Sequence, residues 1–461
     1  MKNEECRIRF LKNCNAATSY SLIHYSLVLY YYILFFKRLS RRIFVCYNFT
    51  MEQNDKNNLN FIDGGVCAPS GFKAAGVHCG IRAGKTKKDL ALIVSEVTAN
   101  AAAVYTTNLV QAAPILVSQE NLKNGKARAV IVNSGIANAC VADGCEKASA
   151  MCALTADALN INANDVIVAS TGVIGRSIDL TPIEKGIKQL VAELSYSNGE
   201  SAAQAIMTTD TVKKEIAVCI DIDGKEVKIG GIAKGSGMIN PNMATMLAFL
   251  TTDAEIESSG LKTLLKNAAD LSFNRVSVDG DTSTNDMLCI MANGKSGVKI
   301  VKGTEAYKKF GGALNAVCIY LAKVIAKDGE GATKLIECVV SGSPSLTDAQ
   351  KIADSVINSP LVKTAMFGQD ANWGRILCAA GYSGAKIDAA KVNITLKSGA
   401  GEIAVCKNGT GIDFCENKAK EILKESEIII DISLNQGGFN ATAWGCDLSY
   451  DYVKINGDYR S

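Results

Sequence analysis

Histidine is almost absent from this chain. Two of the 461 residues are histidines, His24 and His78. A Ser-His-Asp or Cys-His enzyme needs a histidine as its base. His24 lies in an atypical N-terminal stretch, and for His78 a structural role is the simpler interpretation. A nucleophilic enzyme with this composition therefore needs a different base.

A strong excess of charge is also missing. The chain has 49 basic and 46 acidic residues, a net charge of +3, whereas proteins that bind nucleic acid usually carry a marked basic excess. Sixteen cysteines are scattered along the chain without a CxxC pair or a Cys/His cluster of zinc spacing. We therefore expect no nucleic-acid partner, no metal and no organic cofactor, and we expect buried, reduced thiols in a cytosol-like compartment.

The first fifty residues differ in composition from everything that follows. An aromatic and apolar run from Tyr20 to Phe36 is followed by the basic segment Lys37–Arg42. The run falls short of the roughly 20 apolar residues that a membrane span needs, and it has no cleavage site of the A-x-A type. We interpret Met51 as the true start and residues 1–50 as an extension from a misassigned start. A membrane anchor or a targeting segment is the alternative.

Short β-type runs alternate with helical segments in the rest of the chain. The expected strands are 129–133, 166–170, 392–396, 403–405 and 428–434, with a hairpin over 216–231 that turns at Asp223-Gly224. The expected helices are one opened by a capping box at 181–184, one capped by Asp253 and running to about 268, and one over 304–327. This mixture predicts an α+β or layered α/β class.

The segment after the hairpin places a hydroxyl between a constrained loop and an apolar run. Gly235 and Gly237 allow a tight turn or a close approach, and the run 240–242, Asn-Pro-Asn, favours a turn. Thr245 comes next and precedes the apolar Met246–Leu250. In an N-terminal-nucleophile enzyme the chain breaks before such a residue, and the new α-amine, with a pKa of about 8, acts as the base. An ordinary β-strand threonine is the alternative.

The run KGSGMINPNMATMLAFLTTDA, residues 234–254, resembles the self-cleavage signature of the glutamate N-acetyltransferase / ornithine acetyltransferase family, ArgJ. Other stretches resemble this family in its own order, from about residue 62 to the C-terminus. They are GGVCAPSGFKAAGVHCGIR (64–82), TTNLVQAAPI (106–115), NSGIANAC (133–140), STGVIGR (170–176), IMTTDT (206–211), VDGDTSTND (278–286), GQDANWGRI (368–376) and WGCDLSYDYVKINGDYRS (444–461). Minor departures are Tyr105, where Phe is common, and Ile136, where Asn is expected.

The resemblance implies a role for each matching residue. Thr245 would attack the carbonyl of Ala244, divide the chain into 51–244 and 245–461, and then carry the acetyl group in a ping-pong scheme. Thr171 and Gly172 would form the oxyanion hole that both half-reactions require. The implied substrate contacts are Thr209 (with Thr208 as an alternative), Lys234, Thr245, Glu330, Asn456 and Ser461.

The resemblance also implies a layered α/β/β/α sandwich and an α2β2 assembly of the two chains. The implied activity is acetyl transfer from N-acetylornithine to glutamate in cyclic arginine biosynthesis, in the cytoplasm and away from membranes. Some members of the family also accept acetyl-CoA, and no residue here separates the two types. Two other functions stay open. One is an aminopeptidase or amidase of the same fold that uses water as acceptor; the other is a non-enzymatic, membrane-attached protein, suggested by residues 20–36.

Overall fold

The computed structural model describes residues 59–82, 84, 86–240 and 246–458. The N-terminal extension, the start at Met51, the cleavage site Ala244–Thr245 and the C-terminal Ser461 lie outside the described residues. Their assignments stay predictions. The described residues Leu59–Asn240 and Met246–Asp458 belong to one compact unit.

The larger sheet is organised around one long strand that takes part in two layers. Among the described residues it has nine strands, in the order β1-β6-β7-β8-β11-β3-β4-β5, with β2 also paired to β3. The first half of β3 (Leu90–Tyr105) pairs with β2 (Phe72–Val77) and β4 (Lys126–Ile136). Its second half pairs with β11 (Met287–Ala292). The register with β4 shifts between Val94 and Ala99, and a shift of this kind bends a strand.

The two halves of this sheet pack against each other through a shared apolar core. Ile93 of β3 and Ile167 of β5 (Val166–Val173) lie in one buried cluster with Phe249 of β8 (Leu247–Thr252) and Cys289 of β11. Because successive side chains on a strand point to opposite faces, the alternate residues of these strands face outward. These outward side chains are covered by helices.

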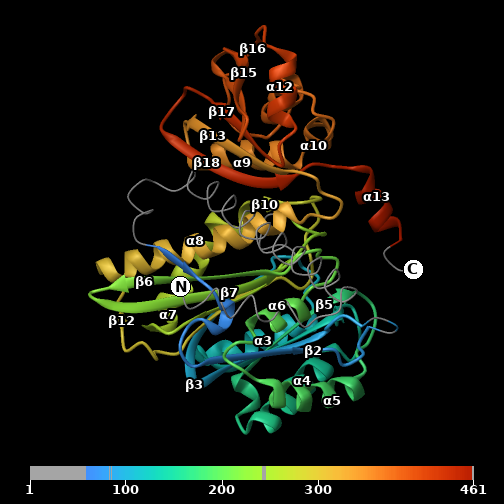
Figure 1. Cartoon of the computed structure of the whole chain (residues 1–461), viewed down its shortest axis with the longest axis vertical. Helices are drawn as coiled ribbons and strands as arrows, with labels where there is room; N and C mark the ends of the chain where they lie inside the picture. The colour runs from blue at the N-terminus through green and yellow to red at the C-terminus, as the bar shows by residue number, and fades with distance from the viewer. Residues whose placement is uncertain (1–58, 83, 85, 241–245, 459–461) are drawn as a thin grey trace, which may run out of the picture. The chain divides into compact units, whose positions relative to one another are not determined.

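The outer layers are two pairs of helices. Helices α4 (Gly144–Leu159) and α5 (Leu180–Glu193) bury the outer side of β2, β3, β4 and β5. Helices α7 (Ser258–Leu271) and α8 (Glu305–Lys327) bury the outer side of β6 (Lys214–Ile222), β7 (Lys225–Lys234), β8 and β11. Figure 1 shows this order of layers, from α8 through the two layers of strands to α4 and α5. The predicted α/β/β/α sandwich is confirmed.

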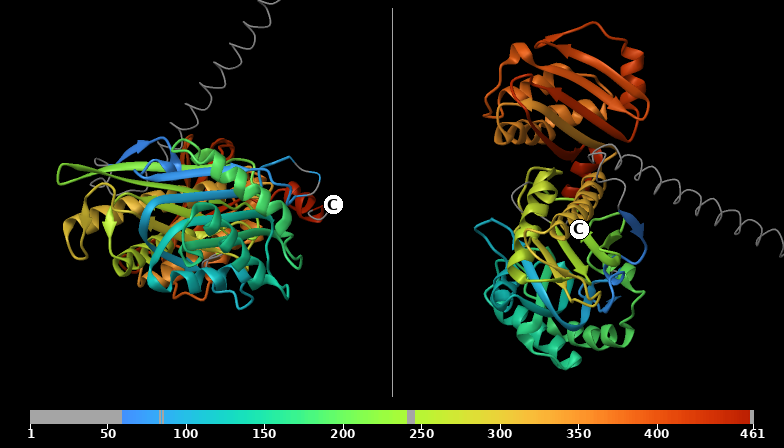
Figure 2. Two further views of the ribbon diagram at one scale, coloured as in Figure 1. Left: turned by 90° about the horizontal axis from the view of Figure 1, so that it is seen from below. Right: turned by 90° about the vertical axis from the view of Figure 1, so that its left-hand side faces the viewer.

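A second sheet, with its own core, follows in the C-terminal part of the chain (Figure 2, orange and red arrows). Its order is β10 (Val276–Ser277), β18 (Phe439–Cys446), β13 (Leu335–Ser343), β17 (Glu427–Ser433), β14 (Asn393–Ser398), β15 (Gly401–Lys407) and β16 (Thr410–Gly411). One face packs on α9 (Leu346–Asn358), α10 (Pro360–Phe367), α11 (Trp373–Gly381) and α12 (Glu416–Leu423). Residues of β17 alternate between buried and half-buried, as expected for a sheet covered on one side. No pattern in the sequence indicated this separate layer pair.

Most of the expected elements are present. The expected strands coincide with parts of β4, β5, β14, β15 and β17, with 392 and 434 falling one residue outside β14 and β17. The hairpin of β6 and β7 turns at Asp223 (φ 53°) and Gly224 (φ 79°), which is the positive-φ geometry that favours Asp-Gly in two-residue hairpins. Helix α8 begins after its cap Thr304 and ends at Asp328.

Two helix caps were predicted wrongly. The residue that caps α5 is Asp179, whose side chain accepts a hydrogen bond from the Thr181 N–H, so Thr181 lies inside the helix. Asp253 does not cap α7, which starts after Glu257. Asp253 is buried and accepts hydrogen bonds from the backbone of Ser70 and Lys228. Both errors have the same cause, because several residues near a helix start can offer an oxygen and only tertiary contacts select one.

Helix α8 is, among the described residues, the one helix long and apolar enough to cross a membrane by length and composition. Its apolar residues, including Phe310, Leu314 and Leu321, are buried in the core of the unit. The cysteines of the described part of the chain are all free, but Cys140 and Cys378 are among several that are exposed. The expectation of uniformly buried thiols is therefore only partly right.

Candidate active site

Several strands end along the same edge of the larger sheet. Lys234, the last residue of β7, pairs with Leu247, the first residue of β8. Leu247 pairs in turn with Met287 of β11, and Met287 pairs with Tyr105, the last residue of β3. Residues that follow or precede these strands are therefore brought together. Thr245 stands two positions before Leu247 in the sequence.

The ends of β4 and β5 meet this edge in a tight approach of two glycines. Gly135 (φ 115°) and Gly172 (φ 131°) pair across the strands, where the register is irregular. A Cβ atom on Gly172 would lie 2.2 Å from the backbone carbon of Gly135. No side chain fits there, and a φ of this sign is strained for any residue other than glycine. The sequence STGVIG therefore needs its glycine at position 172 to hold Thr171 in place.

Lys234 and Thr171 come from different layers and meet at this place. The Nζ atom of Lys234 donates a hydrogen bond of 3.4 Å to Oγ1 of Thr171. Lys234 is 4% exposed, although lysine side chains are mostly solvated. Burial lowers the pKa of Lys234, against the opposing effect of Asp210. Because Oγ1 of Thr171 accepts from the lysine, its own hydrogen stays available to donate to a negative oxygen.

The segment 278–286 is hydrogen-bonded to the ends of β4 and β5. Nδ2 of Asn285 donates to the carbonyl of Ser170 at 2.9 Å and to that of Ala137 at 2.6 Å. The hydroxyl of Ser170 donates to Oδ1 of Asn133 at 2.5 Å. The first of these bonds satisfies the carbonyl of Ser170, which immediately precedes Thr171. The run VDGDTSTND thus has a structural task beside the site that the sequence analysis did not assign.

A buried aspartate joins two of the predicted substrate-contact segments. Asp210 accepts hydrogen bonds from the backbone N–H of Thr208 at 2.9 Å and of Gly235 at 2.7 Å. It also accepts one from Nζ of Lys214 at 2.6 Å. Burial by itself would raise the pKa of Asp210, but the attraction of Lys214 and Lys234 outweighs it and holds the pKa below the usual range.

Thr209 and Glu330 meet through the same loop. Oγ1 of Thr209 lies 2.7 Å from Oγ of Ser236, and the carbonyl of Ser236 accepts a hydrogen bond of 2.7 Å from the backbone N–H of Glu330. A Cβ atom on Gly237 would lie 2.4 Å from the Glu330 carboxyl group. Gly237 is therefore required for the loop to pass close to this carboxylate. Glu330 is buried, although acidic side chains are almost never fully buried unless they are paired.

Asn456 approaches Glu330 from the C-terminal helix. It lies in α13 (Tyr450–Gly457), and its Nδ2 donates to Oε2 of Glu330 at 2.8 Å. Ser449, which caps this helix, donates to the carbonyl of Gly331. The hydroxyl of Tyr452 donates to Oδ2 of Asp279 at 3.4 Å. Helix α13 is therefore folded in toward the predicted site.

The residues on either side of 241–245 are firmly held. The carboxylate of Asp279 accepts hydrogen bonds from the N–H of Met238 at 2.6 Å and of Ile239 at 2.8 Å. Nδ2 of Asn240 donates to the carbonyl of Gly280 at 2.8 Å. On the other side, the carbonyl of Met246 accepts from the N–H of Met287 at 3.1 Å.

The structure thus places most of the described members of the predicted set in two groups of contacts, one pair and one chain of four residues. Lys234 meets Thr171, Thr209 meets Ser236, and Ser236 meets Glu330, which meets Asn456. Sequence reasoning missed the residues that hold these contacts: Asp210, Lys214, Ser236, Asp279 and Asn285. A signal existed for Asp210 and Asn285, which stand inside polar runs between apolar segments. Lys214 gave no signal, because a lysine at the first position of a strand is ordinarily solvated.

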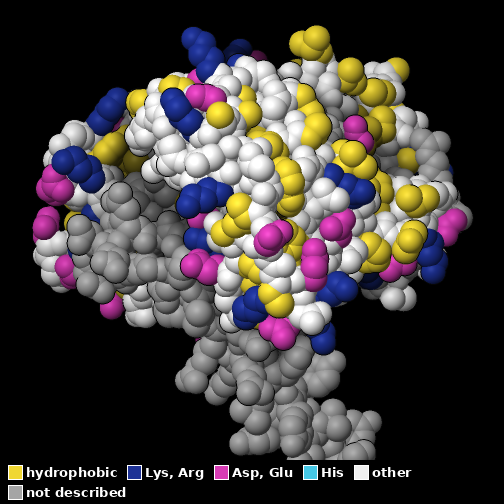
Figure 3. Space-filling model, turned by 90° about the horizontal axis from the view of Figure 1, so that it is seen from above, with side chains coloured by type: hydrophobic (Ala, Val, Ile, Leu, Met, Phe, Trp, Pro, Cys, Tyr) yellow, Lys and Arg dark blue, Asp and Glu magenta, His cyan; other side chains and the backbone are white. Residues whose placement is uncertain are grey.

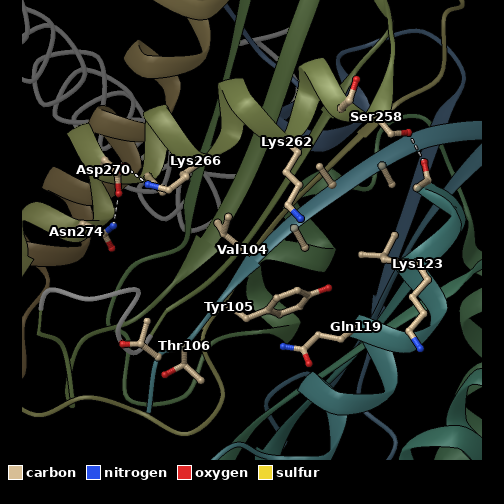
Figure 4. A pocket seen from close by; sticks show the side chains of 18 residues that line it. Val104, Tyr105, Thr106, Gln119, Lys123, Ser258, Lys262, Lys266, Asp270 and Asn274 are labelled. Carbon is tan, nitrogen blue, oxygen red and sulfur yellow. Dashed lines mark hydrogen bonds and ion pairs between the residues drawn. The ribbon is translucent and has the colours of Figure 1, made fainter. Parts of the chain in front are cut away.

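Two hollows of the surface differ in their distance from these residues. A groove of about 800 Å³ lies between α7 and the turn after α3 (Ala113–Asn121), and Figure 4 shows Lys262 and Lys266 of α7 along it with Tyr105 below. It is lined by none of the described predicted site residues. A smaller hollow of about 450 Å³ is lined by Asp328, Gly329 and Gly331, the neighbours of Glu330, and by α13. The smaller hollow is the one adjacent to the predicted chemistry.

Charged side chains are dispersed on the face that Figure 3 draws. On the face drawn in Figure 3, basic and acidic side chains are interspersed without a broad patch of one sign. Within the described residues there is no group of His, Cys, Asp and Glu that could hold a metal ion. Nδ1 of His78 lies 2.9 Å from the carbonyl of Lys87 and 3.2 Å from Asp89, which fits the structural role predicted for it.

Comparison with known proteins gives consistent matches. The model of the ArgJ family matches residues 73–461. The chain is 51% identical over 405 residues to the arginine biosynthesis bifunctional protein ArgJ of Caldanaerobacter subterraneus, covering 87% of this chain and 100% of that protein. It is 50% identical over 406 residues to the protein of the same name from Symbiobacterium thermophilum, with the same coverage. A crystal structure of arginine biosynthesis bifunctional protein ArgJ from Bacillus halodurans, 44% identical, covers 47% of this chain and 100% of its own with a TM-score of 0.45.

Proposed function

The chain belongs to the ArgJ family, and from this membership and the geometry above we propose that it moves an acetyl group from N-acetylornithine to glutamate through Thr245. It is an acetyltransferase of arginine biosynthesis. The observation that carries the residue assignment is the hydrogen bond between Lys234 and Thr171 at the edge where β8 begins. Gly172, where only a glycine fits against the backbone of Gly135, directly follows Thr171.

The proposed first event is cleavage of the chain by its own threonine. Oγ of Thr245 attacks the carbonyl carbon of Ala244, the peptide C–N bond breaks, and the acyl group is transferred from nitrogen to oxygen. Water then hydrolyses the ester, which leaves a carboxylate on Ala244 and a free α-amine on Thr245. That amine, with a pKa of about 8, is the base for later steps. No histidine is required.

The proposed catalytic cycle uses the freed threonine twice. Oγ of Thr245 attacks the acetyl carbonyl of N-acetylornithine, the amide C–N bond breaks, and ornithine leaves with the proton passed on by the α-amine. The amino group of glutamate then attacks the acetyl ester, forms N-acetylglutamate and returns the hydroxyl. Each step passes through a tetrahedral oxyanion, which Thr171 and Gly172 would stabilise. A preorganised donor of this kind contributes roughly 3 kcal/mol.

The remaining residues are proposed to bind the amino-acid parts of both substrates. The ammonium of Lys234 suits a substrate carboxylate, and the carboxylate of Glu330 suits a substrate ammonium. Thr209, with its hydroxyl on Ser236, and Asn456, on Glu330, extend this pattern of paired donors and acceptors. Ser461 is proposed to complete the site from the C-terminus. Whether acetyl-CoA is a second acetyl donor is a matter for assay.

The two chains formed by cleavage are proposed to stay together as an α2β2 assembly in the cytoplasm. The support for their association is the sheet, because β7 belongs to the segment before 245 and β8 to the segment after it. These two strands pair along six residues, from Ile229–Thr252 to Lys234–Leu247. Separation of the chains would break that ladder and expose the core between the two layers.

The test is intact-mass analysis of the purified chain beside a Thr245→Ala variant, followed by acetyl-transfer assays. We expect two associated fragments from the wild type, the second beginning at Thr245, and one uncut, inactive chain from the variant. Thr263→Ala serves as the matched control, because it removes a threonine hydroxyl that lies in α7 and donates to the carbonyl of Ser259.

The acetyl-transfer assays distinguish the proposed acetyltransferase from the alternative activities. Transfer from N-acetylornithine to glutamate supports the proposal, and additional transfer from acetyl-CoA defines a bifunctional enzyme. Release of acetate without transfer would point to the amidase alternative. An uncut and fully active wild type would remove Thr245 as the nucleophile.

A further inference from the structure

Lys214 is a lysine buried without contact to solvent at the start of β6. Its side chain is 0% exposed. Its Nζ atom lies 2.6 Å from Oδ1 of Asp210, 2.6 Å from Oδ2 of Asp328 and 3.3 Å from the carbonyl of Val212. An ammonium has three N–H donors and no acceptor, so these three partners saturate it. Lys214 therefore has no donor left for a substrate and acts through its neighbours.

The two carboxylates that Lys214 joins hold one short segment from both sides. Asp210 accepts from the N–H of Thr208 and of Gly235. Asp328 accepts from the N–H of Thr211 at 3.1 Å, from the Thr211 hydroxyl, and from the N–H of Val212 at 3.4 Å. The backbone on both sides of Thr209 is thus hydrogen-bonded to two carboxylates, those of Asp210 and Asp328. The ammonium of Lys214 contacts both carboxylates.

Asp328 stands in an unfavourable place for a negative charge. It is the C-terminal cap of α8, and the carbonyl end of a helix repels anions. A buried acid in this position needs a cation nearby, and Lys214 provides it. Glu330 follows two residues later and bonds through its N–H to Ser236. The position of Asp328 therefore bears directly on the position of Glu330.

We propose that Lys214 is a positioning residue that sets the spacing between the segment of Thr209 and Lys234 on one side and Glu330 on the other. This inference rests on the proposed function, in which those groups hold the carboxylate and the ammonium of the amino-acid substrates. Self-cleavage needs no amino-acid substrate. Loss of Lys214 should therefore weaken substrate binding while leaving cleavage largely intact, a separation that a general loss of stability would not produce.

The experiment compares Lys214→Met, which keeps the length of the side chain and removes the charge, with the wild type. We expect a folded chain by circular dichroism, two fragments by intact mass, and KM values for N-acetylornithine and glutamate raised by about tenfold or more, with kcat changed less. Lys213→Met is the matched control. Its ammonium pairs with Glu200 at 2.9 Å and Glu215 at 2.6 Å outside the buried cluster, and we expect unchanged KM values.

A second variant covers the case in which Lys214→Met does not fold. Asp328→Asn keeps an oxygen for the N–H groups of Thr211 and Val212 but removes the charge that Lys214 balances, and it should raise both KM values in the same direction. Wild-type KM values in a folded, cleaved Lys214→Met, or in Asp328→Asn if the first variant fails to fold, would overturn the role of Lys214. An inactive wild type would instead overturn the proposed function together with this inference.

Discussion

The two sides of the candidate site are built in different ways. The strand-end side, formed by Thr171, Gly172 and Lys234, lies at the ends of paired strands and is buried or half-buried. The helix side, formed by Tyr452 and Asn456 of α13, belongs to a helix with no buried residue. Within the described residues, α13 reaches the site through single side-chain bonds to Glu330 and Asp279.

This difference suggests a division of labour. Oxyanion stabilisation depends on donors held within a few tenths of an ångström, and strand ends fixed by backbone pairing supply that rigidity. Substrates must also enter and leave, and segments with few buried contacts open at low cost in free energy. We therefore expect substitutions on the strand-end side to affect the chemical step and stability, and substitutions on the helix side to affect mainly KM.

The largest effect is expected for Gly172→Ala. The added methyl group would overlap the backbone of Gly135, and moving the strand end would displace Thr171. We predict a loss of kcat of about a hundredfold to a thousandfold and a loss of stability on the order of 3 kcal/mol, measured by steady-state kinetics and thermal unfolding.

Gly175→Ala is the control for this prediction. Gly175 also has a positive φ, 78°, but a Cβ atom there has no neighbour within 4 Å. The Gly175→Ala substitution should lower the free energy of unfolding by only about 1 kcal/mol, through backbone strain, and should leave kcat near the wild-type value. Equal kcat values for the two variants would contradict the idea that the chemical step depends on rigid strand ends.

Lys234→Met should have the next largest effect, on substrate binding. Removal of a buried charged donor costs about 3 kcal/mol in the complex, which is roughly a hundredfold in KM. Melting temperature should hold or rise, because burial of the ammonium opposes folding and Asp210 keeps Lys214 as a partner. A large fall in melting temperature with unchanged KM would assign Lys234 to the fold rather than to the substrates.

In the wild type, KM and stability should both depend on pH through the ammonium of Lys234. Burial lowers the pKa of Lys234 below the ordinary 10.5, so substrate binding that needs the ammonium should fall as the pH rises through that lowered value. For stability the sign is opposite. The cost of burying the charge is present below the lowered pKa and disappears as the pH rises toward 10.5. KM and melting temperature measured from pH 7 to pH 10 in wild type and Lys234→Met would check both.

Asn456→Ala tests the helix side with a smaller expected effect. It removes the hydrogen bond to Glu330 at 2.8 Å, and a bond of this exposed kind contributes about 1 kcal/mol, or roughly fivefold in KM. Stability and kcat should be unchanged. Val453→Ala, on an exposed position of the same helix, is the control and should leave KM unaltered. A thousandfold loss of kcat in Asn456→Ala would break the comparison.

The smallest effect is expected for Tyr105→Phe, at the end of β3 beside the strand-end side. The hydroxyl oxygen of Tyr105 is buried and has no hydrogen-bond partner within the part of the chain that the structure describes, and burial raises its pKa. Removal of the hydroxyl should stabilise the fold by about 1 kcal/mol without changing kcat or KM. Chemical denaturation would measure this, and a loss of stability would show that the hydroxyl has a favourable partner.

Much of the fold could be predicted from local patterns. Apolar runs marked the strands β4, β5 and β17, and Asp-Gly marked the hairpin turn, because these signals depend on neighbouring residues. The caps of α5 and α7 were missed, since several nearby oxygens compete for the same N–H groups. The buried state of Lys234 and Glu330 was also invisible, because nothing near them in the sequence shows which distant groups will surround them.

The family, the layered class and the residues able to take part in chemistry could be recognised in the sequence alone, because motifs and periodicities are properties of the chain. Which of those residues meet depends on the tertiary structure. Thr171 and Lys234 are brought within hydrogen-bond distance by a sheet that bends at one strand and packs against itself. Lys214 is buried because two acids distant in sequence converge on it. Such convergence follows from packing over the whole unit, which no local pattern encodes.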